Sequence, residues 1–170
     1  MAKALTYEQQ YDRMMRWYKR FEKIVKGRVH DMESDNYEDE AHAFFLNCYY
    51  LKDWIKNDPS LPLIRDEVEQ FINDNECLRL CADICNGLKH LKVTKQGSGK
   101  DPQFGPRQFF VGLGAGETTI AASYSIVTTN GPIDAFELAS ECVKKWDGFI
   151  SAKIKPSTNA PASQGTTVTS

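Results

Sequence analysis

The segment 77–93 constrains the fold more than any other part of the sequence, because its two sides differ sharply. At about 100° of helical rotation per residue, its cysteines and most of its aliphatic side chains fall on one side of a helical wheel. The opposite side is a polar line made of Arg79, Asp83, Asn86 and His90. The glycine at position 87 costs a helix about 1 kcal/mol relative to alanine. The pattern predicts an amphipathic helix in which Gly87 has a packing or functional reason.

The composition is that of a soluble globular protein with one domain. The chain has 170 residues, of which 41% are hydrophobic and 26% are charged. It contains no apolar run of the roughly 20 residues that a membrane span needs, and its N-terminus lacks the apolar region of a signal peptide. The five cysteines are odd in number and lie within helical patterns, which favours free thiols over disulfides. The sequence therefore predicts a cytoplasmic protein that does not enter a membrane.

Charge is distributed unevenly along the chain. Lys and Arg are concentrated in residues 1–28, and Asp and Glu are concentrated in residues 31–40. This pattern is typical of a solvated basic helix followed by an acidic first turn, which suits the dipole of the next helix. The alternative is a nucleic-acid-binding patch, although such patches usually accompany a basic domain and the net charge here is -2.

The periodicity of apolar residues predicts a mainly α-helical fold. We expect an antiparallel bundle of about five helices, with a β-hairpin inserted before the last helix. The expected helices are 7–26, 37–56, 63–74, 77–93 and 135–152, and the expected hairpin, about 108–128, pairs 108–113 with 118–128. Thr6 and Gln9 have the spacing of a capping box for the first helix, and Asp134 is a candidate cap for the last. Residues 1–155 form one domain in this interpretation, and 156–170 form a disordered tail because they are uncharged and poor in apolar residues.

Two glycine-rich segments invite nucleotide-binding interpretations. The first, 94–105, reads as a mobile surface loop. Gly97, Gly99 and Lys100 also suggest a phosphate-binding loop, but the spacing is incomplete and the segment does not join a strand to a helix. The second, 112–116, resembles a dinucleotide fingerprint but leads from strand to strand, so turn chemistry explains its glycines better.

Cysteines and aromatic residues also admit two interpretations. Cys77, Cys81 and Cys85 lie on one helix face, where a metal would need a fourth ligand from elsewhere. They coincide with the apolar side, where free cysteine behaves as a small hydrophobic residue, so we expect no metal site and no cofactor. The aromatic residues at helical spacing are expected in the core rather than in a base-stacking platform. They are Trp17, Tyr18, Tyr49, Tyr50 and Trp54.

Among the three histidines, His90 is the candidate for chemistry. His30 and His42 lie near the acidic run and are expected to be surface or capping residues. His90 shares a helix face with Asn86 and has Lys89 beside it, an arrangement that suits a general acid or base in phosphodiester chemistry. The alternative is a partly exposed histidine on a solvated face.

Two strings carry a family resemblance: FFLNCYYLKDWIKND (44–58) and CLRLCADICNGLKHL (77–91). They are similar to a group of short bacterial and prophage proteins, and more broadly they resemble the HEPN superfamily. That resemblance implies an antiparallel helical bundle, frequently a homodimer, and many members are metal-independent endoribonucleases of toxin–antitoxin and defence systems. The family signature is an arginine, usually followed by a polar residue such as asparagine, with a histidine four to six residues further on.

In this chain the polar residue of the signature falls on Asn86 and the histidine on His90, but the arginine position holds Cys85. A thiol has neither the charge nor the forked donors of a guanidinium. Arg79 lies about 16 Å from His90 along a helix axis, so only a second subunit could bring an arginine close.

Two hypotheses therefore remain open. In the first, the protein binds or cleaves RNA: His90 acts as acid or base, Asn86 orients the ribose or phosphate, and Lys89 stabilises phosphate charge, in a cleft completed by a second subunit. In the second, the protein is a non-catalytic interaction module of a defence or phage system, and the same polar residues contact a protein partner.

Overall fold

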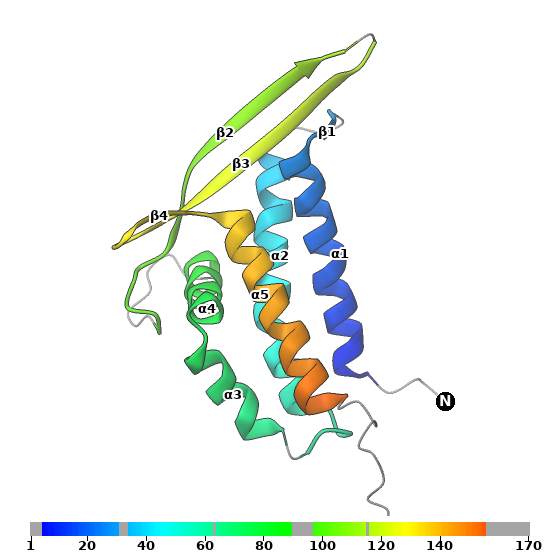
Figure 1. Ribbon diagram of the computed structural model, residues 1–170, viewed down its shortest axis with the longest axis vertical. Coiled ribbons are helices and arrows are strands. Elements are labelled where there is room, and N and C mark those ends of the chain that lie inside the picture. Colours follow the sequence, from blue (N-terminus) through cyan, green and yellow to red (C-terminus); the bar gives the residue numbers. More distant parts are fainter. Residues whose placement is uncertain (1–4, 31–33, 63, 90–96, 115, 156–170) are drawn as a thin grey trace, which may run out of the picture.

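The computed structural model describes residues 5–30, 34–62, 64–89, 97–114 and 116–155. This part of the chain consists of five α-helices and a four-stranded antiparallel sheet (Figure 1). The helices are α1 (Tyr7–Lys26), α2 (Ser34–Asn57), α3 (Arg65–Asp74), α4 (Glu76–Lys89) and α5 (Ala135–Phe149), and a π-helical turn, η1 (Ile150–Ile154), follows α5. The strands are β1 (Arg28–Val29), β2 (Gln103–Leu113), β3 (Thr118–Thr128) and β4 (Gly131–Asp134). The prediction of a mainly α-helical protein is confirmed.

The helices enclose a core of large aromatic side chains. Figure 1 shows α1, α2 and α5 side by side, with α3 and α4 along one flank of this group. Phe21 of α1 is fully buried, and its ring centroid lies 6.5 Å from those of both Phe44 and Phe45 of α2. Such tilted and edge-to-face pairs stabilise a core beyond the burial of their area. Trp146 of α5 and Met14 of α1 are buried in the same cluster.

The predicted bounds of α1 are confirmed, but its predicted capping box is wrong. The Thr6 side chain makes no capping hydrogen bond. Instead the Tyr7 amide donates to the Asp58 carboxylate at 2.9 Å, across 51 residues of sequence. A charged acceptor suits the positive end of the helix dipole, and only the folded turn after α2 brings it there. Gly27 ends α1 with φ at 94°, a conformation that glycine adopts readily.

The other helices differ from their predicted ranges at the ends. α2 begins at Ser34 and ends at Asn57, and α3 begins at Arg65. α4 is described as far as Lys89, so the end of its predicted range, 90–93, lies outside the described residues. Asp134 caps α5 as predicted, accepting hydrogen bonds at 2.8 Å from the amides of Phe136 and Glu137. The predicted tail, 156–170, also lies outside the described residues.

The sheet is larger than the predicted hairpin. β2 and β3 pair in antiparallel register, and β1 and β4 both pair with β3, giving the order β1-β3-β2 with β4 beside β3. β2 begins at Gln103, because residues 103–107, which resemble a loop in sequence, pair with the far end of β3 through a register shift between Phe104 and Arg107. Gly105 fits there because a Cβ would meet the Val127 side chain at 2.4 Å.

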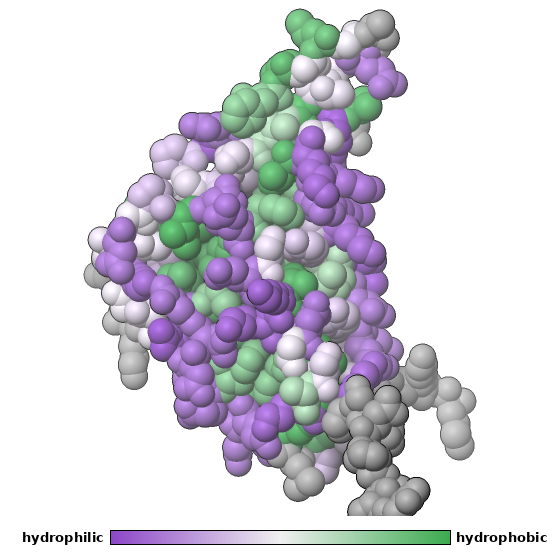
Figure 2. Space-filling model, viewed as in Figure 1, coloured by the Kyte–Doolittle hydropathy of each residue, from purple (hydrophilic) through white to green (hydrophobic). Residues whose placement is uncertain are grey.

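The β2–β3 pair forms an arm that projects beyond the ends of α1 and α2 (Figure 1). Apolar side chains follow the arm to its tip, next to hydrophilic helical surface (Figure 2). Phe110, Val111 and Leu113 of β2 are all more than half exposed. In the part of the chain that the structure describes, no helix combines the length and apolar character required to cross a bilayer.

Candidate functional site

Two of the three predicted site residues lie at the described end of α4. Asn86 is half-buried and Lys89 is exposed. His90, the predicted acid or base, lies outside the described residues, so its prediction stays untested. The described residues give no packing reason for glycine at position 87, since a Cβ there would meet none of them within 4 Å. Leu88, expected on the inward side, is 40% exposed.

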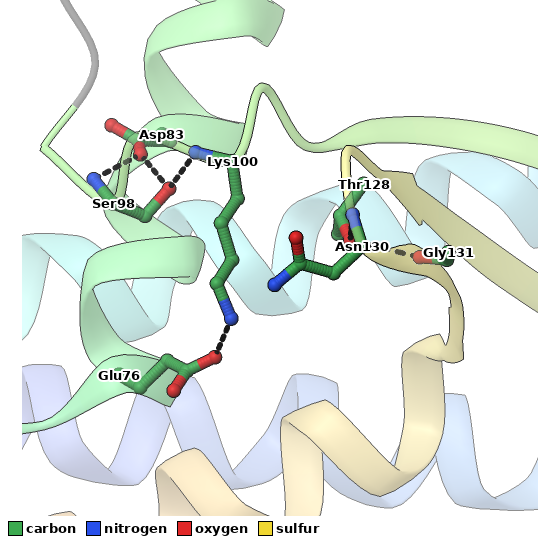
Figure 3. A network of polar contacts seen from close by, with 7 residues as sticks. All are labelled: Glu76, Asp83, Ser98, Lys100, Thr128, Asn130 and Gly131. Atoms are coloured by element: carbon green, nitrogen blue, oxygen red, sulfur yellow. Dashed lines mark hydrogen bonds and ion pairs between the residues drawn. The ribbon is translucent and has the colours of Figure 1, made fainter.

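The predicted polar line is wrong at Asp83, which is buried and only 3% exposed. Its carboxylate accepts a hydrogen bond from the Gly97 amide at 2.8 Å. It also accepts hydrogen bonds from the Ser98 amide at 2.7 Å and from the Ser98 hydroxyl (Figure 3). Because a buried carboxylate needs several donors, this set explains how the charge is accommodated. A helical wheel cannot reveal a loop that returns over the polar side. Asp83 therefore holds the loop to α4 and is not part of an open site.

The same contacts argue against a phosphate-binding loop at 97–100. The two amides that point into the loop already bind a carboxylate of the protein. Lys100 forms an ion pair with Glu76, and this hydrogen bond lowers the pKa of the Glu76 carboxyl (Figure 3). The donors and the cation that would hold a phosphate therefore have internal anionic partners.

A different surface combines cations with aromatic rings, and we call it the basic–aromatic face. It consists of Arg13, Trp17 and Arg20 of α1, Tyr50 and Trp54 of α2, and Lys89 of α4. The Arg13 guanidinium lies 5.5 Å from the centroid of the Trp54 ring, and that of Arg20 lies 4.8 Å from Trp17. Lys89 Nζ lies 5.9 Å from the centroid of Tyr50, within the usual range of a cation–π contact.

Local sequence spacing explains how the basic–aromatic face forms. Arg13, Trp17 and Arg20 follow each other at intervals of four and three residues, so they lie on one side of α1. Tyr50 and Trp54 are likewise four residues apart on α2. All three aromatic rings are half-buried, which leaves part of each ring open to a ligand, while the three cations are exposed.

A polar seam between α1 and α2 fixes the position of Arg13. Gln10 is fully buried, and its amide nitrogen donates to the backbone oxygen of Asn47 at 2.9 Å and to the side-chain oxygen at 3.1 Å. Arg13 Nη1 in turn donates to Gln10 Oε1 at 2.7 Å. Because this acceptor is a neutral amide, the guanidinium is oriented over Trp54 without being neutralised.

Ion pairs mark the limits of the basic–aromatic face. Beyond Tyr49, both Lys52 and Lys56 contact the Glu69 carboxylate, at 3.7 and 2.7 Å. Burial lowers the pKa of Lys52, but Tyr49 and the carboxylates of Asp53 and Glu69 together have the larger effect and raise that pKa above its usual value. Lys52 is therefore a charged side chain that already has anionic partners. At the other end Arg20 lies 4.0 Å from Glu40.

No protein-family model, curated protein or solved structure matches the chain. Its function is therefore argued from its own residues. The sequence assigned Trp17, Tyr50 and Trp54 to the core, and Trp17 and Trp54 do pack against it while staying half-buried. Helical periodicity does not reveal that each of the three rings also lies beside a cation. The usable signal was the four-residue spacing of Arg13 and Trp17, together with that of Tyr50 and Trp54.

The remaining histidines have structural contacts. His30 Nδ1 lies 2.8 Å from the Tyr37 hydroxyl. His42 is half-buried rather than fully on the surface, and its ring packs edge-on against Phe104 of β2 at 4.3 Å between centroids. Burial lowers the pKa of His42 even though Glu38 and Asp39 oppose the effect.

Proposed function

We propose that this protein binds single-stranded RNA through the basic–aromatic face. The observation that carries the proposal is the pairing of exposed cations with half-buried rings on three helices: Arg13 with Trp54, Arg20 with Trp17, and Lys89 with Tyr50. Rings of this kind stack with unpaired bases, and neighbouring cations contact the phosphates. The net charge of -2 does not exclude binding, because Glu69 beside the face is paired with Lys52 and Lys56, and Glu40 at its other end contacts both Arg20 and Arg28.

The resemblance to the HEPN superfamily supports RNA as the ligand. In this proposal Lys89 contacts a phosphate, and Asn86, three residues before it on α4, orients the ribose or phosphate. His90 would be the acid or base only in a protein that cleaves RNA. We propose binding rather than cleavage, because the position of the signature arginine is Cys85, which is fully buried in α4 and cannot reach a phosphate.

The test is the affinity of a fluorescently labelled single-stranded RNA, measured by anisotropy at low and high salt. Stacking of one base contributes about 1–3 kcal/mol, so Trp54→Ala should weaken binding by about 5- to 150-fold. Arg13→Ala should also weaken binding and reduce the slope of log affinity against log salt by about 0.7. Lys153→Ala, which removes an exposed cation from η1, should bind as the wild type does.

Equal affinities for Arg13→Ala and Lys153→Ala would show that binding follows total charge and would refute the proposed face. The same samples distinguish binding from cleavage, since the RNA should remain intact in EDTA. An EDTA-resistant cleavage that is lost in His90→Ala would instead establish a catalytic HEPN-like protein.

A second candidate function is an interaction module that pairs with a second copy of the chain, as the homodimer expectation requires. β2 lies at the end of the strand order, so its outer edge has no strand partner among the described residues. Five of the seven exposed large hydrophobic side chains in the described part of the chain lie on this sheet, and they are Val29, Phe110, Val111, Leu113 and Val127. Antiparallel pairing of β2 with its own copy would satisfy the backbone groups of this edge and bring Phe110, Val111 and Leu113 of the two copies next to one another.

Light scattering coupled to size-exclusion chromatography tests the homodimer. We expect a dimer for the wild type and for Leu5→Lys, which places the same charge at an exposed leucine outside the sheet. Val111→Lys should shift the protein to a monomer. A wild-type protein that stays monomeric at high concentration would rule out this candidate.

A further inference from the structure

Three cysteines from three different helices meet in the core. They are Cys48 of α2, Cys81 of α4 and Cys142 of α5, and their sulfur atoms all lie within 4.8 Å of one another. Each side chain is almost completely buried, with an exposed fraction of 1% or less. This group differs from the Cys77, Cys81 and Cys85 set that the sequence suggested, because tertiary packing selects one cysteine from each helix.

The spacing of the three sulfurs suits a thiophilic metal ion. With metal–sulfur bonds of about 2.3 Å, three thiolates around one ion lie about 3.8–4.0 Å apart, so the group needs only small side-chain adjustments. Soft sulfur ligands favour Cu(I) and Zn(II) over hard cations. Since each helix is fixed by the surrounding core, the ligands are held together before an ion arrives.

A nearby indole supplies an independent observation. Trp146 Nε1 is buried and has no hydrogen-bond partner of acceptable geometry, and Trp146 itself is only 1% exposed. Trp146 follows Cys142 by four residues on α5, so the indole lies on the same side of that helix as the Cys142 sulfur. A neutral thiol accepts a hydrogen bond weakly, whereas a metal-bound thiolate accepts it well, and donors of this kind commonly support metal ligands.

The alternative is that the three thiols are simply core residues. Cys81 donates to the backbone oxygen of Phe45 at 3.4 Å, and Cys142 donates to that of Cys77 at 3.3 Å, as neutral thiols do. Those bonds satisfy two of the three thiols. They leave the Trp146 indole, like the Tyr124 hydroxyl, without a hydrogen-bond partner among the described residues.

A surface cavity lies next to the group of three sulfurs. Cys77, which is 6% exposed, accepts a hydrogen bond from Cys142 through its backbone oxygen and lines this cavity of about 360 Å³. Four carboxylates and one lysine line it as well, and they are Glu76, Asp134, Glu137, Glu141 and Lys100. Lys100 is paired with Glu76, so the other carboxylates favour a cation at the cavity.

We propose that Cys48, Cys81 and Cys142 bind one thiophilic d10 ion, Cu(I), which three thiolates can hold, whereas Zn(II) would need a fourth ligand that this group does not offer. Binding forms three metal–sulfur bonds, and each thiol releases its proton to solvent. No electron is transferred. Trp146 is a positioning residue that donates its indole N–H to one of these thiolates.

The test uses the reduced, metal-free full chain under anaerobic conditions. Zn(II) and Cu(I) are titrated separately against a chromophoric chelator, with proton release and thermal unfolding measured in parallel. We expect one Cu(I) per chain, proton release, a higher unfolding temperature and weaker binding of Zn(II).

Matched variants separate a metal site from core packing. Cys85→Ala removes a buried cysteine of α4 outside the group of three, so it should keep one ion per chain. Cys48→Ala should abolish stoichiometric binding while circular dichroism shows a folded protein. Trp146→Phe, which keeps a large ring, should weaken binding by about 10- to 100-fold.

The proposal is overturned if the wild type binds no Cu(I) at stoichiometric concentrations, or if Cys48→Ala and Cys85→Ala bind equally. If Cys48→Ala does not fold, Trp146→Phe decides: an unchanged affinity rejects the site. None of these measurements involves RNA, so failure of this inference and failure of the RNA proposal are distinguishable.

Discussion

Replacement of the buried Asp83 by asparagine should destabilise the protein by about 1–2 kcal/mol. The carboxylate accepts three hydrogen bonds, one at Oδ1 from the Gly97 amide and two at Oδ2 from the Ser98 amide and hydroxyl. Asparagine keeps one acceptor oxygen and replaces the other with an NH2 group, so one or two of these bonds are lost. Bonds to a charged acceptor contribute about 1.5–3 kcal/mol each, but the loop is partly exposed and its donors regain water when released, so we take about 1 kcal/mol per bond. For a chain of this size that corresponds to a fall of about 2–8 °C in unfolding temperature.

Urea unfolding of the wild type and of Asp83→Asn measures this loss. Hydrogen exchange at residues 97–100 should accelerate in the same variant, because the loop is released locally. Asp74→Asn is the matched control: Asp74 is exposed and accepts one hydrogen bond, from Gln70 at 2.7 Å, so its loss should stay within about 0.5 kcal/mol. Equal stability losses at the two positions would refute the assignment of Asp83 as the anchor of the loop.

Three further predictions concern α4, the start of α1 and the contact between α2 and the sheet. Gly87→Ala should stabilise the protein by about 0.5–1 kcal/mol in urea unfolding, since the methyl group meets none of the described residues and alanine favours a helix. Burial raises the pKa of Asp58, but hydrogen bonds from Ser60 and Tyr7 outweigh it and hold that pKa below its usual value. The stabilisation by Asp58 is therefore fully present above the pKa that this carboxyl has in the unfolded chain, and it is lost as pH falls through the lower pKa of the folded protein. Asp58→Asn should remove this dependence on acid pH from thermal unfolding curves. Burial lowers the pKa of His42, so protonation favours the unfolded chain and stability should fall as pH drops below about 6.5, a fall that His42→Gln should abolish in the same scans.

Local sequence signals were sufficient for elements that depend on their own residues. The apolar stripe of α1 and the glycine after it predicted the range 7–26, which the structure confirms. Asp134 was recognised as a cap because a carboxylate just before a helix reaches the amides two and three residues further on. These signals act within about one helical turn, so no tertiary contact was needed to interpret them.

Signals that depend on a distant partner were missed. Gly105 was assigned to the loop 94–105, yet it belongs to β2, where glycine is required by the approach of Val127 from β3. Asp58 replaces Thr6 as the acceptor at the start of α1, although 51 residues separate it from Tyr7. In both cases the contact that determines the structure joins two residues that lie too far apart in the sequence for a local pattern to include both.

α2 links the two proposed sites and also separates them. Cys48 and Tyr50 are two residues apart, about 200° around a helix, so one faces the core and the other faces the open side. A substitution at Cys48 therefore removes a sulfur without touching the basic–aromatic face, and Trp54→Ala alters that face without reaching the sulfurs. Both sites nevertheless require α4 to lie against α2, because α4 supplies Cys81 to one and Lys89 to the other. The packing of these two helices is thus the common physical requirement, and a variant that separates them would disable both sites at once.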